Sequence, residues 1–399
     1  MTKPTTPFSQ TELLPQEEKL EVHHGWDKLY IGLPRETSYQ EKRVCLTPNA
    51  VAAITANGHR VLVESGAGNG AKFTDREYSE AGAEISRDTK KVFAAPIVLK
   101  VEPPSLKEVE MLHPQSIIFS ALQLKTQSKK YFEKLSEKRI TALAFEYIRD
   151  VDGSYPLVKA LSEIAGTASV LIASELLSDY SKGHGVIFGN ISGVAPIEVV
   201  ILGAGTVGQY AARSALGLGA NVKVFDNSLA KLRNIQNQIG HPLHTSTIQP
   251  KSLLKALKRT DVVIGAIRGK ERSPIIVTEE MVSHMKKGSV VIDVSIDMGG
   301  CFETSEVTSH DSPTIVKNGV IHYGVPNIPS RYSRTSSISI SNIFTPYLLH
   351  IGEEGGLENT LRFDRGLRNG LYCYHGILTN KAIGNWFGLS YRDINLLIF

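Results

Sequence analysis

The sequence is poor in the features that mark disulfide-rich secreted proteins and zinc-binding modules. Its 399 residues contain only three cysteines, Cys45, Cys301 and Cys373, which lie far apart and form no Cys-x-x-Cys pair. An odd, scattered set of cysteines argues against a disulfide framework or a structural zinc site and fits a reducing compartment. We therefore expect buried free thiols, no bound metal and a cytoplasmic location.

The sequence also lacks long apolar runs and a large excess of charge of one sign. No stretch of 18 or more apolar residues occurs, so no transmembrane helix and no membrane insertion are expected. Residues 1–28 are polar and lack the apolar core of a secretory signal, which predicts a flexible N-terminal extension. The formal net charge is only +4 and the basic residues form no stripe, so nucleic-acid binding is not indicated.

What is present is an alternation of apolar strand-like runs with helical patterns, over a length that predicts two domains. The strands expected in the first half are residues 29–33, 60–64, 97–101, 116–121 and 140–145, with helices at about 47–57 and 127–138 between them. The pattern over residues 157–177 predicts one long helix with few charges, which could connect the two domains as a shared central helix (the spine). Later strands are expected at residues 199–202, 222–225, 261–266, 290–294 and 320–325.

The C-terminal part returns to helical patterns, with candidate helices at residues 341–351 and 370–387. The fold class predicted is α/β, with two Rossmann-like, doubly wound parallel-sheet domains around a cleft, linked by long helices. The first of these domains is expected to be discontinuous in sequence. Residues 29–155 and 335–399 are expected to form a substrate domain, and residues 156–334 a nucleotide-binding domain inserted between them.

The most informative stretch runs from Glu198 to Asp226. An apolar strand ends in the turn Gly203-Ala204-Gly205-Thr206-Val207-Gly208, a helix of small residues follows, and a second strand ends in Asp226. Strand, glycine turn, helix, strand and acid make up a dinucleotide-binding fingerprint in its required context. The alternative is a glycine turn in a sheet protein that binds no nucleotide.

Each residue of the fingerprint has a physical role. Gly203 permits the tight turn, Gly205 lets the backbone approach a pyrophosphate, and Gly208 lets the helix pack on the strand. The pyrophosphate would be held by the free N–H groups and the dipole of the helix N-terminus. Asp226 can accept hydrogen bonds from a ribose, so the cofactor expected is NAD.

Residues that directly follow strands are the candidates for chemistry, because ligands of open α/β sheets sit beyond the carboxyl ends of the strands. These residues are Arg43, Glu102, Gln123, Asp297 and Asn327. Arg43 could grip a substrate carboxylate with two parallel hydrogen bonds, or belong to a solvated charge cluster with its neighbours. Asp297 could orient a ribose or substrate or carry a proton, or bond the backbone of its own turn. Asn327 could bind a carboxamide or sit in a plain turn.

Six motifs are together highly specific and resemble one family. They are IGLPRETSYQEKRVCLTP from Ile31, VESGAG from Val63, LSEIAG from Leu161, GVAPIEVVILGAGTVG from Gly193, HMKKGSVVIDVSIDMGGCFETS from His284 and RTSSISISNIFTPYLL from Arg334. The chain resembles the alanine dehydrogenase and nicotinamide nucleotide transhydrogenase alpha-subunit family from about Leu29 to Phe387. It resembles alanine dehydrogenase more closely, because residues 149–154 lack the Arg-Gln-Asp loop of the transhydrogenase subunit.

The resemblance implies two Rossmann-like domains around a cleft and a homo-oligomer, commonly a hexamer. It implies that Arg43 holds the substrate carboxylate and that Asp297 is the catalytic aspartate. It also places Gly203, Gly205, Gly208, Asp226, Ser162, Lys231 and Asn327 in the NAD site.

Two positions depart from the alanine dehydrogenase pattern. Glu102 stands where the family has a substrate-binding lysine, and Gln123 stands where it has a catalytic histidine. A glutamate would repel a pyruvate carboxylate, at a cost on the order of 4 kcal/mol for two charges about 4 Å apart near a surface. Glutamine cannot exchange a proton near neutral pH. Glu102 could instead pair with Arg43 or act as a base.

Three functions therefore stay open. The first is the NAD-dependent, reversible oxidative deamination of L-alanine to pyruvate and ammonia, or of another amino acid, with Asp297 and Glu102 handling protons. The second is a transhydrogenase alpha-type subunit that binds NADH and docks on membrane partner chains. The third is a catalytically altered NAD-binding homologue that acts as a sensor or assembly partner.

Overall fold

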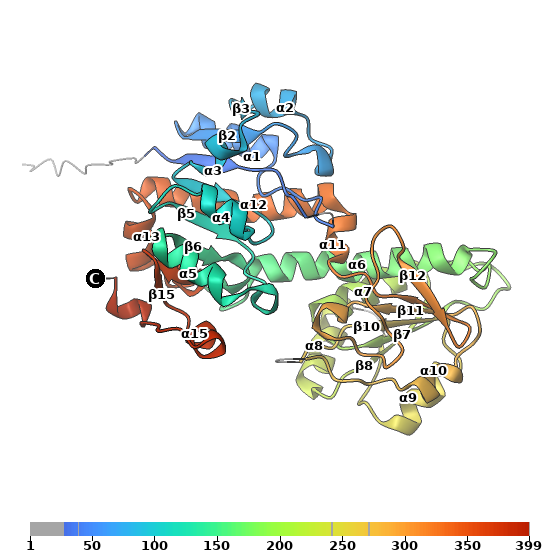
Figure 1. Cartoon of the computed structure of the whole chain (residues 1–399). Helices are drawn as coiled ribbons and strands as arrows, with labels where there is room; N and C mark the ends of the chain where they lie inside the picture. The colour runs from blue at the N-terminus through green and yellow to red at the C-terminus, as the bar shows by residue number, and fades with distance from the viewer. Residues whose placement is uncertain (1–27, 39, 241, 270–271, 399) are drawn as a thin grey trace, which may run out of the picture.

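The chain is described by a computed structural model over residues 28–38, 40–240, 242–269 and 272–398. Two α/β units are visible, and the long helix α6 (Pro156–Ser178) runs from one into the other (Figure 1). Except for Lys28, the N-terminal extension expected at residues 1–28 lies outside the described residues.

The first unit is built on an eight-stranded sheet in the order β15-β14-β6-β5-β4-β1-β2-β3. Its strands are β1 (Tyr30–Leu33), β2 (Arg60–Glu64), β3 (Glu84–Ser86), β4 (Ile97–Leu99), β5 (Ile117–Ser120), β6 (Thr141–Ala144), β14 (Leu371–Tyr374) and β15 (Ile377–Leu378). β1 to β6 are parallel, and the C-terminal β14 and β15 extend the sheet antiparallel beyond β6. The chain leaves β1 on one side towards β2 and returns on the other side as β4, so the topological switch point lies between β1 and β4.

The second unit has a seven-stranded sheet in the order β12-β13-β11-β10-β7-β8-β9. Its strands are β7 (Glu198–Leu202), β8 (Asn221–Phe225), β9 (His244–Ser246), β10 (Val262–Gly265), β11 (Val290–Asp293), β12 (Thr314–Lys317) and β13 (Val320–Tyr323). All pairings are parallel except that of the edge strand β12. The switch point here lies between β7 and β10.

Helices cover both faces of the sheets, which explains why the strands are apolar throughout rather than alternating. In β7, Val199 and Ile201 enter the core on one face, whereas Val200 and Leu202 enter the core on the other. The shorter helices are α1 (Pro48–Ala56), α2 (Asp75–Glu80), α3 (Thr89–Phe93), α4 (Leu106–Met111), α5 (Lys129–Glu137), α7 (Thr206–Gly217), α8 (Leu229–Ile239), α9 (Pro250–Leu257), α10 (Glu279–Ser283), α11 (Ile328–Arg331), α13 (Leu357–Phe363), α14 (Arg365–Gly370) and α15 (Lys381–Phe387). Single 3-10 turns are η1 (Asn69–Ala71), η2 (Leu124–Thr126), η3 (Phe145–Tyr147), η4 (Ile296–Met298) and η5 (Ile394–Leu396).

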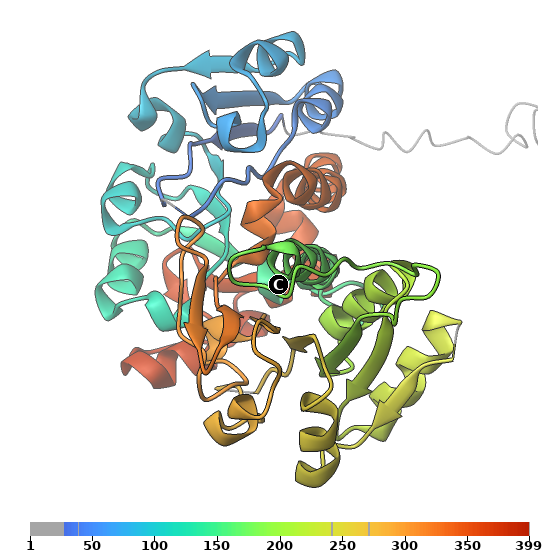
Figure 2. The ribbon, with the colours of Figure 1, turned by 90° about the vertical axis from the view of Figure 1, so that its right-hand side faces the viewer.

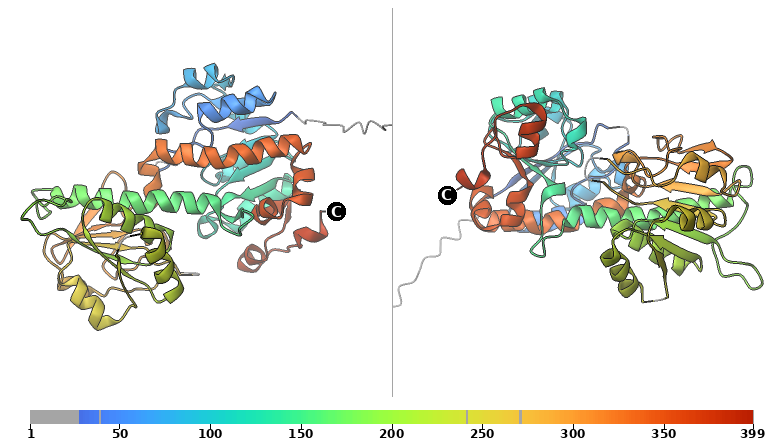
Figure 3. Two further views of the ribbon diagram at one scale, coloured as in Figure 1. Left: turned by 180° about the vertical axis from the view of Figure 1, so that it is seen from behind. Right: turned by 90° about the horizontal axis from the view of Figure 1, so that it is seen from below.

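Two long helices lie side by side behind the first sheet, α6 and α12 (Ser333–Glu353), and α6 continues onto the second unit (Figure 3). Gly166 lets α6 approach α7 closely, because a Cβ at this position would lie 2.4 Å from the carbonyl oxygen of Val207. In the described part of the chain, α6 is the helix that is long and apolar enough to cross a membrane by length and composition. Its contacts with α7, α11 and α12 are those of a core helix.

One element differs from the sequence-based expectation. The helix predicted over residues 370–387 is wrong, because residues 371–378 form the antiparallel pair β14–β15 and only α15 is helical. The cause is a two-residue hairpin turn in which both His375 (φ 47°) and Gly376 (φ 82°) take the left-handed conformation that a type I′ turn requires. Figure 2 shows this C-terminal segment beside the strands and helices of residues 100–145.

Candidate active site

The glycine turn after β7 is built around close backbone approaches. Gly203 has φ 109°, and a Cβ there would lie 2.6 Å from the carbonyl oxygen of Ala266 after β10. A Cβ at Gly208 would lie 1.8 Å from the carbonyl oxygen of Gly203, so only glycine allows this turn to close. A Cβ at Gly205, in contrast, would meet no protein atom within 4 Å. The surface over Gly205 is therefore open, at the N-terminus of α7, where no side chain caps the helix.

Asp226 ties the end of β8 to this turn. Its Oδ2 accepts a hydrogen bond from the backbone N–H of Ala204 at 2.8 Å, and its Oδ1 accepts one from Ser228 at 2.8 Å. Each carboxylate oxygen keeps a second acceptor site for a ribose hydroxyl. Lys231 lies one turn further, exposed on α8, and Ser162 lies on α6 with its hydroxyl donating to Val158 at 2.6 Å. The residues present thus fit a dinucleotide.

Arg43 is not part of a solvated charge cluster, since it is only 6% exposed. Its guanidinium is held by Glu41 through two bonds, Nε to Oε1 at 2.7 Å and Nη2 to Oε2 at 2.6 Å. Burial raises the pKa of the Glu41 carboxyl, but the charge and hydrogen bonds of Arg43 outweigh it, so the pKa is below its ordinary value. Glu41 Oε2 also accepts from Asn327 Nδ2 at 3.0 Å. This carboxylate therefore joins two predicted site residues, one from each unit.

Asn327 follows β13 and lies in the left-handed conformation, with φ 58°. Beside it, Ser330 donates to the carbonyl oxygen of Gln40 at 2.6 Å and accepts from the backbone N–H of Lys42 at 3.0 Å. The loop that carries Arg43 is thus bound to the second unit by several polar contacts.

A second buried ion-pair group lies at the switch point of the first sheet. Lys100 directly follows β4, and its Nζ lies 3.2 Å from Oε2 of Glu36 and 3.1 Å from Oε1 of Glu108. Burial raises the pKa of Glu36 to about 7, although Lys100 opposes this shift. The carboxyl groups of Glu36 and Glu108 therefore already neutralise the ammonium group of Lys100.

Glu102 lies two residues further on the same loop and is half-buried. Burial raises the pKa of its carboxyl, and the negative charge of Glu41 adds to the shift. A hydrogen bond from Ser38 opposes it. The pairing of Glu102 with Arg43 that the sequence left open is wrong as a direct ion pair, because the partner of Arg43 is Glu41.

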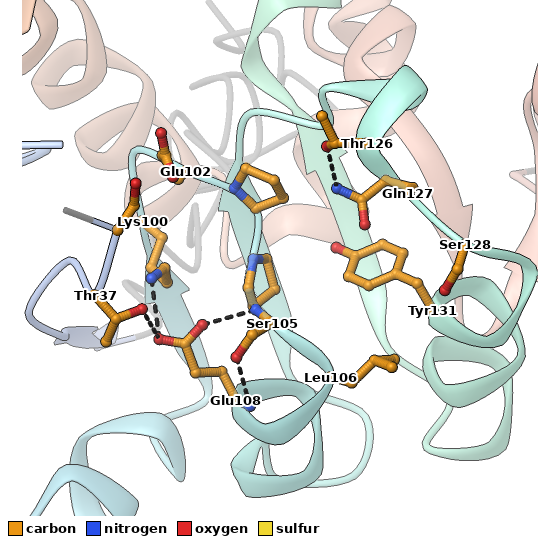
Figure 4. Close-up of a pocket in the computed structure, with 13 residues that line it drawn as sticks. Thr37, Lys100, Glu102, Ser105, Leu106, Glu108, Thr126, Gln127, Ser128 and Tyr131 are labelled. Carbon is orange, nitrogen blue, oxygen red and sulfur yellow. Dashed lines mark hydrogen bonds and ion pairs between the residues drawn. The ribbon is translucent and has the colours of Figure 1, made fainter. Parts of the chain in front are cut away.

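Glu102 is part of the wall of a cavity of about 400 Å³ at the carboxyl ends of β1, β4 and β5. Lys100, Glu102 and Thr37 lie along one side of it, and Gln127, Ser128 and Tyr131 along the other (Figure 4). The remaining lining residues are Ser38, Pro103, Pro104, Ser105, Leu106, Glu108 and Thr126. The cavity lies where ligands bind in open α/β sheets, outside the carboxyl ends of the strands at a switch point.

Gln123 is exposed, in the left-handed conformation with φ 47°, on the loop after β5. The carboxylate of Glu146 holds this loop through hydrogen bonds to its backbone. Its Oε1 accepts from the backbone N–H of Leu122 at 2.8 Å and of Gln123 at 3.2 Å. Its Oε2 is buried without a hydrogen-bond partner in the described part of the chain, and burial raises the pKa of the carboxyl.

Asp297 sits in the 3-10 turn η4, directly after β11. Its carboxylate, 47% exposed, contacts Arg268 with Oδ2 and Nη2 3.3 Å apart. Asp293 fixes the loop by accepting from the backbone N–H of Cys301 at 2.9 Å, and burial raises its pKa to about 6. Met298 Sδ lies 3.6 Å from Lys125 Nζ of the first unit, so the Asp297 loop and the Gln123 loop meet across the two units.

Several residues of this site were not identified from the sequence. Glu41 was visible only as a charged neighbour of Arg43, and Glu36, Glu146 and Arg268 had no motif of their own. Their roles come from tertiary contacts. A weak signal existed for Glu36 and Arg268, because each follows a strand of the sheet closely.

Models of known families match both halves of the chain. The model described as "Alanine dehydrogenase/PNT, N-terminal domain" matches residues 32–165, and "Alanine dehydrogenase/PNT, C-terminal domain" matches residues 169–381. The chain belongs to the alanine dehydrogenase/PNT family. Among its relatives, "Alanine dehydrogenase 2" of Staphylococcus aureus (strain USA300) is 37% identical over 366 residues, which cover 91% of this chain and 98% of the relative.

Solved structures agree with this family. One named L-alanine dehydrogenase is 34% identical, covers 90% of this chain and 99% of its own, and has a TM-score of 0.84. A transhydrogenase from Sinorhizobium meliloti is similar in fold, with a TM-score of 0.75 and 22% identity over 88% of this chain and 99% of its own. The predicted family and the predicted architecture of two parallel-sheet α/β domains are confirmed.

Proposed function

We propose that this member of the alanine dehydrogenase/PNT family catalyses the reversible, NAD-dependent oxidative deamination of an L-amino acid. L-alanine is the first substrate to test, because the named relatives are alanine dehydrogenases. The amino acid, NAD⁺ and water would give the 2-oxo acid, ammonium, NADH and a proton. The observation that carries the proposal is the Glu41 carboxylate, which holds Arg43 rigidly and links it to Asn327 of the nucleotide-binding unit.

In this proposal the second unit binds NAD and the first unit binds the amino-acid substrate. Bound NAD would supply the hydride acceptor, and the turn from Gly203 to Gly208 and Asp226 would hold its pyrophosphate and ribose. Arg43 would bind the substrate carboxylate with the N–H groups that Glu41 leaves unused, at a low entropic cost because the guanidinium is already fixed. Asp297, beside Arg268, would carry the proton that leaves the substrate or the attacking water.

The proton chemistry needs carboxyl groups, because Gln123 offers none. Glu146 lies directly under the backbone of Gln123 and has a buried, unpartnered oxygen. Glu102 stands on the neighbouring loop. Both have a raised pKa, which brings a carboxyl closer to the range in which it can exchange protons near neutral pH.

The test measures NADH formation from NAD⁺ with L-alanine and a panel of L-amino acids, and NADH oxidation with pyruvate plus ammonium. We expect turnover above a no-enzyme control, and a loss of about 10² to 10⁴ in kcat for Asp297→Asn without loss of NADH binding. The Glu102→Lys/Gln123→His double variant restores the family residues and should raise activity with pyruvate. Absence of turnover with every amino acid, while NADH still binds, would contradict the proposal.

A transhydrogenase alpha-type role is the second candidate, and Glu102 and Gln123 favour it because they weaken a small-acid site. The fold also matches a transhydrogenase. Such a subunit should bind NADH and be retained by membranes that contain its partner chains. If it binds NADH but has neither a partner nor a substrate, the chain is a nucleotide-binding homologue with altered catalysis.

We also propose that the protein works as a homo-oligomer in the cytoplasm. Three buried free cysteines support a reducing compartment. Exposed apolar side chains on the connection after α6, at Ile187, Ile191 and Val194, support contacts with further copies. Light scattering after size-exclusion chromatography should give a multiple of the 43.6 kDa chain mass, with a hexamer expected from the family resemblance.

A further inference from the structure

The switch point of the first sheet has more negative than positive groups. Four carboxylates, Glu36, Glu41, Glu102 and Glu108, accompany two cations, Arg43 and Lys100. Both cations are already paired, Arg43 with Glu41 and Lys100 with Glu36 and Glu108. Glu102 makes no ion pair with any residue in the described ranges, although it is close enough to Arg43 and Lys100 to feel their charge.

The cavity beside Glu102 is larger than the methyl side chain of alanine requires. Its volume of about 400 Å³ is within the range of small-molecule sites. Pro103, Pro104 and the ring of Tyr131 give it apolar surface, and the hydroxyls of Ser38 and Thr126 give it polar partners. Three charged residues line the cavity, and because Lys100 and Glu108 pair with each other, Glu102 is left to meet a ligand. Apolar walls beside this carboxylate suit a side chain that has a methylene stem and a charged end.

We propose that the preferred substrate is an L-amino acid with an ammonium group at the end of a flexible side chain, which pairs with Glu102 while its carboxylate binds Arg43. This inference rests on the proposed dehydrogenase function. The methylene stem contacts Pro103 and Pro104 in the cavity. The added cation compensates the excess negative charge at the switch point, and the two anchors select against short or neutral amino acids.

Charge selection can be separated from size selection with substrates of matched length. The kcat/KM with NAD⁺ is measured for L-lysine, L-ornithine, L-norleucine and L-alanine. Norleucine has the stem of lysine without the ammonium group. We expect at least one of the two cationic substrates to exceed norleucine about tenfold or more, as a charge-assisted hydrogen bond predicts.

Glu102→Gln should lower the ratio of cationic to neutral substrate about tenfold, because the amide keeps the shape but not the charge. Glu110→Gln, an exposed residue of α4 outside the cavity, is the matched control and should leave the ratio unchanged. Equal or better turnover of norleucine, or a ratio that Glu102→Gln does not alter, would overturn the proposal.

Binding is measured separately, so that failure of this inference can be told from failure of the proposed reaction. Calorimetric titration of L-lysine, L-ornithine and L-norleucine into the NADH-loaded protein reports recognition without turnover. Tighter binding of a cationic amino acid, lost in Glu102→Gln, supports the inference even if no amino acid is oxidised. Equal binding of the cationic and neutral compounds, or no binding of any of them, refutes it.

Discussion

Asn327 Nδ2 of the second unit lies 3.0 Å from Oε2 of Glu41, the carboxylate that holds the guanidinium of Arg43. The contact places a residue proposed for the cofactor site and one proposed for the substrate site on the same buried carboxylate. The position of the Arg43 loop therefore depends on the position of the second unit.

Glu41→Gln should destabilise the protein and weaken the amino-acid site. Removing one partner of a buried ion pair leaves Arg43 uncompensated, at a cost of about 3–5 kcal/mol in the free energy of unfolding. Denaturant unfolding measures this cost. Asn327→Ala removes a single hydrogen bond to the carboxylate and should cost less, and Glu80→Gln, in an exposed pair with Arg76, should have no measurable effect. Equal effects of all three substitutions would contradict the role given to Glu41.

The glycine turn allows binding and folding to be separated with two substitutions. Gly205→Ala adds a methyl group that meets no protein atom, so the melting temperature should stay or rise slightly, while the Kd for NADH should rise about tenfold or more. Gly208→Ala places a methyl group against the carbonyl of Gly203 and should lower the melting temperature. Calorimetry and thermal unfolding give the two readouts. Unchanged NADH affinity in Gly205→Ala would place the cofactor elsewhere.

Glu36 should make the protein less stable as the pH rises from about 4.5 to about 7. The folded-state pKa of about 7 exceeds the ordinary value of 4.5, so between these values the folded state holds a proton that the unfolded state has released. The stabilisation is complete below the lower value and lost above the upper one, with a total on the order of 3 kcal/mol. Melting temperatures of the native protein and of Glu36→Gln, compared between pH 4 and 8, isolate this contribution. Parallel pH curves would refute it.

Glu146→Gln should reduce kcat by about 10² to 10⁴ if its free oxygen exchanges the proton that Gln123 cannot. The retained carbonyl oxygen can still accept from Leu122 and Gln123, so the loop should stay folded and NADH binding should be unchanged. The pH profile of kcat distinguishes this role from a structural one. Loss of a titrating limb in the variant supports proton transfer, and an unshifted profile with lower kcat indicates support of the loop alone.

The sequence predicted those parts of the molecule whose physical causes are local. The glycine turn is one of these, because its strand, turn and helix are contiguous and its backbone geometry excludes other residues at Gly203 and Gly208. The long helix α6 is another, because few charges and small residues make it suited to burial. The hairpin at His375 and Gly376 was missed because its strands are short and apolar, and a helical pattern fits the same residues.

The site was predicted less completely than the fold. Arg43 and Asn327 were identified as separate candidates, but the carboxylate of Glu41 that joins them was not. Glu41 is 286 positions away from Asn327, and only the folded chain brings the two together. The same holds for Glu146, whose significance depends on the backbone of a loop 23 residues earlier.

Gly166 shows how far the influence of a residue can reach in this architecture. It lies on α6, in contact with the first turn of the helix that begins at the glycine turn. A methyl group at Gly166 would push against Val207 and shift the glycine turn that is expected to hold the pyrophosphate. Gly166 itself belongs to the long helix α6 and not to this turn. During divergence of the family, substitutions at packing positions of α6, and not only at Ser162, would therefore change the affinity for the cofactor. Inherited differences in affinity should be sought along the spine as well as in the turn.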